Sequence, residues 1–172
     1  ALDGISAGYL IGFSPLAHFG CKEIVQKFAP AIIAGEKRIC LAITEAFAGS
    51  DVANIQTTAK LSEDGTHYIV NGTKKWITNG TFCDYFVTAV RTGKKEDGAK
   101  GISLLFIERS EGLQTKKIIT SYSPAAGTAY ITLDNVKVPK EHLLGKENEG
   151  FKCIMTNFNH ERWSIIVGQV AL

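Results

Sequence analysis

The sequence predicts a mainly β fold, an antiparallel β-barrel flanked by partial helical segments, and three observations carry this prediction. Eight short runs with strand-like alternation follow one another between glycine-centred turns over about a hundred residues. Asp64-Gly65 and Asn71-Gly72 are typical of two-residue hairpins, because type I′ turns need positive φ at both central positions. Apolar residues recur at helical spacing both before and after this stretch.

The first helical stretch lies between Cys21 and Ala34, where apolar residues recur at helical spacing. Pro30 is expected to break or restart this helix because proline has no backbone N–H. Gly35 is expected to close it. The predicted strands that follow are residues 38–44, 57–61, 67–70, 74–78, 85–92, 102–108, 113–118 and 130–138.

A helical period returns at Phe151 and continues to the end of the chain. The residues that share one face are Phe151, Met155, Phe158, Arg162 and Ile166. The chain is therefore expected to divide into a helical part at residues 1–36, a β-barrel at 37–146 and the start of a second helical part at 147–172.

Composition limits the class of protein. A chain of 172 residues with 45% hydrophobic content is long enough for one domain with a substantial core. The 19 Lys and Arg against 17 Asp and Glu leave a net charge of +2, which offers no basic stripe for nucleic acid. No apolar stretch approaches the roughly 20 residues that span a bilayer.

The basic pairs and the cysteines look structural. Lys74-Lys75, Lys94-Lys95 and Lys116-Lys117 are too short for an interaction tail and are expected to be solvated turns or strand ends. The four cysteines form no C-x-x-C pair and have no histidine at metal spacing, so no metal site is predicted. Buried free thiols in a reducing compartment are expected.

The segment from Leu41 to Asp51 is a strand that runs into a turn of small residues. Its free backbone N–H groups, the hydroxyls of Thr44 and Ser50, and Gly49 could hold a phosphate or the edge of a heteroaromatic ring. The alternative is a plain strand-to-turn transition, in which both hydroxyls satisfy their own backbone. The pattern leaves both interpretations open.

The segment Lys75 to Gly80 carries a large ring beside a hydroxyl. Strand alternation would put Trp76 and Thr78 on one face, and Lys75 and Ile77 on the other. Trp76 could pack against a planar cofactor and Thr78 could hydrogen-bond it, whereas the alternative is ordinary core packing. Asn79-Gly80 is one more turn signal.

Glu161 lies inside the apolar stripe of the last helix, seven residues after Ile154 and four before Ile165. Burial would raise the pKa of this carboxyl toward values useful for removing a proton. The alternatives are a local ion pair with Arg162 or His160, or exposure of the helix at this point.

Taken together, these segments resemble the acyl-CoA dehydrogenase family along nearly the whole chain. The most specific matches are Ile43 to Asp51, Asn71 to Gly80, and Asp134 to Pro139. The resemblance implies an α+β protein in which this barrel lies between an N-terminal helical domain and a C-terminal four-helix domain. Ala46-Phe47 replaces the usual proline and small residue, which hints at a divergent branch such as a fungal one.

The resemblance implies the cofactor FAD and an acyl-CoA substrate. The residues implied at the FAD site are Leu41, Ile43, Thr44, Gly49, Ser50, Trp76, Ile77 and Thr78. Those implied near the substrate are Ser50, Phe158, Asn159 and Arg162. The implied reaction is α,β-dehydrogenation of a fatty acyl thioester with hydride transfer to FAD. Glu161 is the candidate base, as in the isovaleryl- and long-chain-type enzymes.

The resemblance also implies partners and surroundings. Electrons would pass to an electron-transferring flavoprotein or to oxygen, the intact protein would be a tetramer or dimer, and it would work in the mitochondrial matrix or the peroxisome. The competing functions are an acyl-CoA oxidase or nitroalkane-oxidase-like flavoenzyme and, from another class, a non-catalytic β-barrel interaction module or proteolytic fragment.

Overall fold

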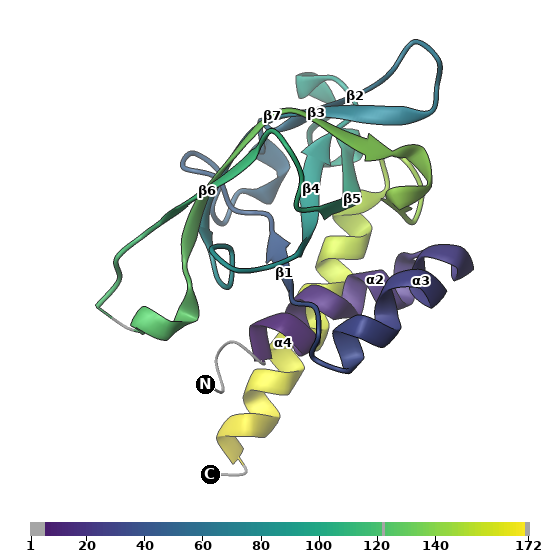
Figure 1. Cartoon of the computed structure of the whole chain (residues 1–172). Coiled ribbons are helices and arrows are strands. Elements are labelled where there is room, and N and C mark those ends of the chain that lie inside the picture. Colours follow the sequence, from purple (N-terminus) through teal and green to yellow (C-terminus); the bar gives the residue numbers. More distant parts are fainter. Residues whose placement is uncertain (1–5, 122, 171–172) are drawn as a thin grey trace.

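A mixed β-sheet forms the centre of the computed structural model, with the helices gathered on one side of it (Figure 1). The structure describes residues 6–121 and 123–170. Its strands are β1 (Ile39–Ala42), β2 (Thr58–Leu61), β3 (His67–Ile77), β4 (Tyr85–Arg91), β5 (Ile102–Glu108), β6 (Leu113–Lys117), β7 (Ala129–Pro139) and β8 (Leu143–Leu144). Its longer helices are the π-helix η1 (Ser6–Phe13), α2 (Ser14–Phe19), α3 (Lys22–Ile33) and α4 (Gly150–Val170).

The central part is built of strands flanked by helices, as predicted, but the sheet is mixed and does not close into an antiparallel barrel. The strand order is β6-β7-β3-β2-β4-β5-β8, and within the described residues no pairing joins the two ends, so the sheet is open. Both β1 and β2 run parallel to β4. They occupy successive stretches of one edge of β4, since β5 pairs along the other edge. Residues 43–57 leave the sheet between them.

A hairpin is present at one of the two predicted positions, but its turn is not the predicted one. Asp64-Gly65 lies in the loop that joins the antiparallel pair β2 and β3, whose last strand pair is Leu61 with Tyr68. Gly65, at φ +68°, has positive φ whereas Asp64 does not, so the loop is longer than a two-residue type I′ turn. Asn71-Gly72 is not a turn, because β3 continues through it with a bulge between Val70 and Gly72. Gly72 is needed there because a Cβ atom would lie 2.6 Å from the Cα of Thr57.

The helix α3 also departs from the sequence prediction. It runs without a break through Pro30, so the expected interruption is wrong, and the helix loses only the hydrogen bond that an N–H of residue 30 would donate to the carbonyl of Gln26. Gly35 follows at φ +76°, and its N–H donates to the carbonyl of Ile32 at 3.0 Å, so the predicted helix end is confirmed.

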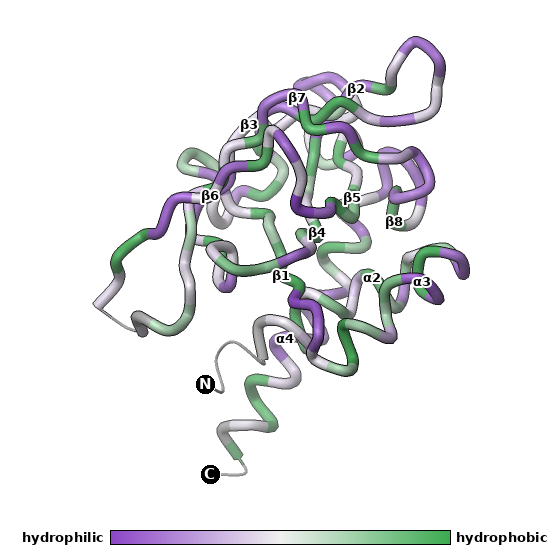
Figure 2. Tube along the Cα trace, viewed as in Figure 1, coloured by the Kyte–Doolittle hydropathy of each residue, from purple (hydrophilic) through white to green (hydrophobic). Residues whose placement is uncertain are grey.

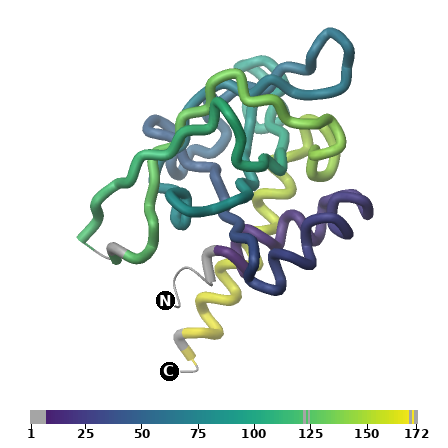
Figure 3. Tube along the Cα trace, viewed as in Figure 1, coloured from purple at the N-terminus to yellow at the C-terminus, as the bar shows by residue number. Residues whose placement is uncertain are grey.

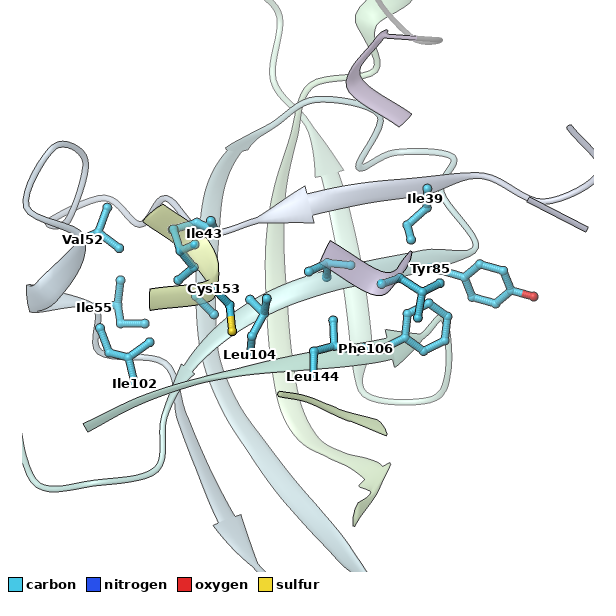
Figure 4. Packing of buried hydrophobic residues seen from close by; sticks show 14 of the residues in the cluster. Ile39, Ile43, Val52, Ile55, Tyr85, Ile102, Leu104, Phe106, Leu144 and Cys153 are labelled. Atoms are coloured by element: carbon cyan, nitrogen blue, oxygen red, sulfur yellow. The ribbon is translucent and has the colours of Figure 1, made fainter. Parts of the chain in front are cut away.

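Two hydrophobic clusters lie on opposite faces of the sheet, and β4 and β5 contribute to both. The first fills the space between the sheet and the helices (Figure 4), and includes Phe28, Ile39, Leu104 and Phe106. The second, with Tyr68 and Leu105 among its members, forms where the sheet curls over itself. Hydrophobic segments accordingly concentrate in the interior, while the outer loops are hydrophilic (Figure 2).

The helix α4 begins directly on the sheet. A Cβ atom at Gly150 would lie 2.5 Å from the carbonyl carbon of Ser103 on β5, so only glycine allows this approach. Cys153 and Ile154 in its first half are buried, whereas Trp163 and Val170 in its second half are exposed. The trace in Figure 3 shows α4 passing beside α2 and extending beyond the sheet.

Candidate active site

A hollow with a volume of about 130 Å³ lies where η1, the end of β1, the end of β3 and α4 meet. Its lining residues are Ile11, Leu41, Ile43, Thr44, Trp76, Ile77, Thr78 and Phe158. Six of them are residues that the sequence predicts at a cofactor site, and Phe158 is predicted near the substrate. Two chain segments about thirty residues apart therefore form one wall, as the folding of β3 beside the end of β1 requires.

The two wall segments are joined by the backbone. The N–H of Lys75 donates to the carbonyl of Thr44 at 2.8 Å. Trp76 follows at φ +64°, and the pairing of β3 with β7 shifts register between Lys74 and Ile77. This bulge breaks the alternation that the sequence predicts, so that Trp76, Ile77 and Thr78 all line the hollow.

The chemistry of the lining fits the edge of a flat heteroaromatic ring. Leu41, Ile43 and Ile77 offer apolar surface, and Trp76, which is 52% exposed, offers a ring face. Among the described residues no side-chain hydrogen bond involves Thr44 or Thr78. The alternative in which the Thr44 hydroxyl hydrogen-bonds to its own backbone is therefore wrong.

Gly49 and Ser50 do not line the hollow. Both are exposed in the loop that follows the short Glu45–Ala48 bridge, and a Cβ atom on Gly49 would meet nothing within 4 Å. The space beside them is open to a bound molecule. Their predicted contacts with FAD and acyl-CoA stay predictions.

Glu161 lies one helical turn beyond Phe158 on α4. Its Oε1 accepts a hydrogen bond of 2.6 Å from Nδ2 of Asn157, which also donates to the carbonyl of Ile11 at 3.2 Å. Asn157 is buried, and its Oδ1 has no hydrogen-bond partner in the described part of the chain. The amide thus ties the carboxyl of Glu161 to a segment that lines the hollow.

Burial raises the pKa of Glu161 to about 7, against the opposing attraction of the Arg162 charge. No ion pair within 4.0 Å involves Glu161 among the described residues. Arg162 instead donates to Oδ1 of Asn159 at 2.9 Å, and both are exposed. The ion pair that was an alternative for Glu161 is absent, and a carboxyl with this pKa can act as a base near neutral pH.

Lys74 is the residue for which the sequence prediction is most clearly wrong. It was expected at a solvated strand end, yet its side chain is fully buried. Its Nζ donates to Oε1 of Glu45 at 2.8 Å and to the carbonyl of Ile43 at 3.0 Å. A buried lysine is tolerated because it is paired in this way.

Ile11 is the lining residue that sequence reasoning missed. Its segment, Ser6–Phe13, is apolar without helical periodicity, and forms a π-helix. Gly12 lets this helix lie directly on β1, since a Cβ atom there would be 3.0 Å from the Cα of Cys40. The glycine next to an apolar run was the only available signal.

The prediction of buried free thiols is confirmed for three of the four cysteines. All four are free thiols, and Cys40, Cys83 and Cys153 are buried while Cys21 is exposed. In the described ranges 6–121 and 123–170, no group of three or more His, Cys, Asp or Glu side chains could hold a metal ion. In the same described ranges, none of the helices combines the length and the hydropathy of a membrane-spanning segment.

Comparison with known proteins decides the family. The model of the acyl-CoA dehydrogenase middle domain matches residues 40–136, more than half of the chain. The chain belongs to the acyl-CoA dehydrogenase family. The resemblance carried by Ile43 to Asp51, Asn71 to Gly80 and Asp134 to Pro139 is thereby confirmed.

Individual members of the acyl-CoA dehydrogenase family agree over almost the whole chain. The acyl-CoA dehydrogenase apdG of Emericella nidulans is 51% identical over 166 residues, which are 95% of this chain and 37% of that protein. The acyl-CoA dehydrogenase AFT10-1 of Alternaria alternata is 48% identical over 162 residues, 94% of this chain and 37% of that protein. The crystal structure of an acyl-CoA dehydrogenase complexed with FAD from Bacillus anthracis matches with a TM-score of 0.88 and 33% identity, covering 97% of this chain and 29% of that one.

Proposed function

We propose that this chain is the middle segment of a flavin-dependent acyl-CoA dehydrogenase and supplies one flank of its FAD site. The observation that carries the proposal is the hollow, because Thr44, Trp76 and Thr78 come together there with Phe158. Since the chain spans 37% of the fungal relatives, helical domains on both sides of residues 37–146 are part of this proposal.

The residues of this chain would bind and orient the cofactor and the substrate. Leu41, Ile43 and Ile77 would pack on the cofactor ring and exclude water, and the hydroxyls of Thr44 and Thr78 would hydrogen-bond its polar edge. When bound, FAD supplies the acceptor for the hydride that leaves the β-carbon of the acyl thioester. Gly49 and Ser50 would meet parts of the cofactor and substrate that lie outside the hollow.

Glu161 would take the α-proton of the acyl thioester. Its pKa of about 7 leaves a large fraction ionised at neutral pH and makes the carboxylate a stronger base than an exposed one. Asn157 holds this carboxyl through the 2.6 Å hydrogen bond. Phe158 would contact the acyl chain, and the exposed pair Asn159 and Arg162 would contact the CoA portion.

The intact protein would pass electrons to an electron-transferring flavoprotein, assemble as a tetramer or dimer, and work in the mitochondrial matrix or the peroxisome. An oxidase that reduces oxygen is the second candidate within flavoenzymes. Trp76 lies beside the hollow and is half exposed, so an electron acceptor could approach it from the surface. Nζ of Lys75 lies 4.8 Å from the centroid of its ring. Turnover of the full-length protein with each acceptor separates the two.

The test compares the full-length protein with the isolated chain. Full-length protein is expected to bind FAD stoichiometrically and to lose its visible flavin absorbance when a fatty acyl-CoA is added without an acceptor. The isolated 172-residue chain is expected to bind FAD weakly, because it supplies only one flank. Full-length protein without flavin, or with flavin that no acyl-CoA reduces, would contradict the proposed function, and so would an isolated chain that keeps its fold but lacks the hollow.

A further inference from the structure

A fully buried ion pair lies directly behind the wall of the hollow. Lys74 is 0% exposed and Glu45 is 6% exposed. Besides the 2.8 Å contact with Lys74, Glu45 accepts hydrogen bonds from two backbone N–H groups, that of Gln56 at 2.6 Å and that of Thr57 at 3.0 Å. Every oxygen of the carboxylate therefore has a partner.

The charges of the pair support each other. Burial alone would raise the pKa of Glu45, but the Lys74 charge and the hydrogen bonds from Lys74, Thr57 and Gln56 lower it overall. Burial lowers the pKa of Lys74 to about 8, and Glu45 limits this fall. Both groups are charged at neutral pH, so the pair acts as a fixed ionic contact inside the protein.

The ion pair joins three segments that are distant in sequence. Nζ of Lys74 donates a hydrogen bond to the carbonyl of Ile43, and the backbone N–H of the adjacent Lys75 donates one to the carbonyl of Thr44. Glu45 fixes the Gln56-Thr57 backbone, beside which β3 passes at Gly72. These contacts set the spacing between residues 41–44 and 76–78, the two strips that line the hollow.

We infer that Lys74 and Glu45 are positioning residues for the cofactor site, an inference that rests on the proposed function. Neither residue lines the hollow. Through the carbonyl of Ile43 and the neighbouring backbone, they fix residues 41–44 relative to residues 76–78, the two strips against which the cofactor ring would pack. An apolar core at this place would stabilise the fold equally well, but it would leave the carbonyl of Ile43 without its donor.

The test separates positioning from stability in the full-length protein. Three variants are compared: Lys74→Met, the double variant Lys74→Met with Glu45→Gln, and Lys60→Met as a control at an exposed lysine on β2. The measurements are the dissociation constant for FAD by fluorescence titration, the visible spectrum of bound flavin, and the thermal midpoint of the apoprotein.

Lys74→Met is expected to lower the thermal midpoint and to weaken FAD binding by about tenfold or more, because a hydrogen bond to a charged group is lost from the wall. The double variant has no unpaired buried charge, so its midpoint is expected to recover toward that of the unsubstituted protein. Its FAD affinity is expected to stay weak and its flavin spectrum shifted. Lys60→Met is expected to match the unsubstituted protein.

The inference is overturned if the double variant binds FAD with unchanged affinity and an unchanged spectrum, or if FAD affinity follows the thermal midpoint across all variants. The second result would make the pair purely structural. Failure of the proposed function is a different result, because the unsubstituted full-length protein would then bind no FAD.

Discussion

Glu161→Gln in the full-length protein is expected to leave FAD bound and to slow reduction of the flavin by acyl-CoA by about 10²–10⁴-fold. Glutamine keeps the size of the side chain and can still accept the hydrogen bond from Nδ2 of Asn157, but it cannot take the α-proton. The loss is therefore expected in the chemical step and not in cofactor binding.

Stopped-flow absorbance of the bound flavin after mixing with acyl-CoA measures this step directly. Glu141→Gln serves as the control, since Glu141 is an exposed carboxylate away from the hollow. Undiminished reduction in Glu161→Gln would exclude Glu161 as the base while leaving the cofactor site untouched.

Glu161 is also expected to make both the free energy of unfolding and the rate of flavin reduction depend on pH. Because the pKa of Glu161 is raised from 4.5 to about 7, the folded protein binds more protons than the unfolded chain between these values. Its contribution to the free energy of unfolding is therefore greatest at low pH and is lost as the pH rises through this window. Flavin reduction has the opposite trend and should increase as Glu161 ionises, and Glu161→Gln should abolish both trends.

Lys74→Met is expected to lower the free energy of unfolding by about 3–5 kcal/mol, the largest stability effect predicted for this chain. The substitution leaves the carboxylate of Glu45 buried without its counter-charge. Protonation of Glu45 would remove its unpaired charge, so the loss in free energy of unfolding caused by Lys74→Met should become smaller as the pH falls.

Urea denaturation of the variant and the unsubstituted protein measures this difference. Lys116→Met on β6, where the lysine is exposed, is the matched control and should change the free energy of unfolding by less than about 0.5 kcal/mol. A loss at Lys74 no larger than that at Lys116 would contradict the account of a buried, paired lysine.

The sequence predicted strand positions well, because alternation reports which residues face a core. It did not predict how the strands pair. The parallel contacts of β1 and β2 with β4 depend on residues 43–57 leaving the sheet, and alternation carries no information about such excursions. The turn predicted at Asn71-Gly72 is absent for a related reason. Gly72 is required because Thr57 packs closely against it, and not because the chain turns there.

The candidate site was predictable where a motif carried it. Thr44, Trp76 and Thr78 were named from short segments, and the structure brings them to one hollow. Lys74 was not predictable, because a lysine pair beside a turn signal is usually solvated and only tertiary packing places Glu45 next to it. Ile11 was missed because a π-helix lacks the 3.6-residue period on which helix prediction depends.

Filling the hollow tests the central claim most directly. Thr44→Trp places a bulky ring where the flank of the flavin is proposed to lie, and Thr132→Trp places the same ring on β7, away from the lining. In the full-length protein, the FAD dissociation constant is expected to rise by about a hundredfold for Thr44→Trp and to stay unchanged for Thr132→Trp. A Thr44→Trp protein that binds FAD as tightly as the unsubstituted protein would contradict the account.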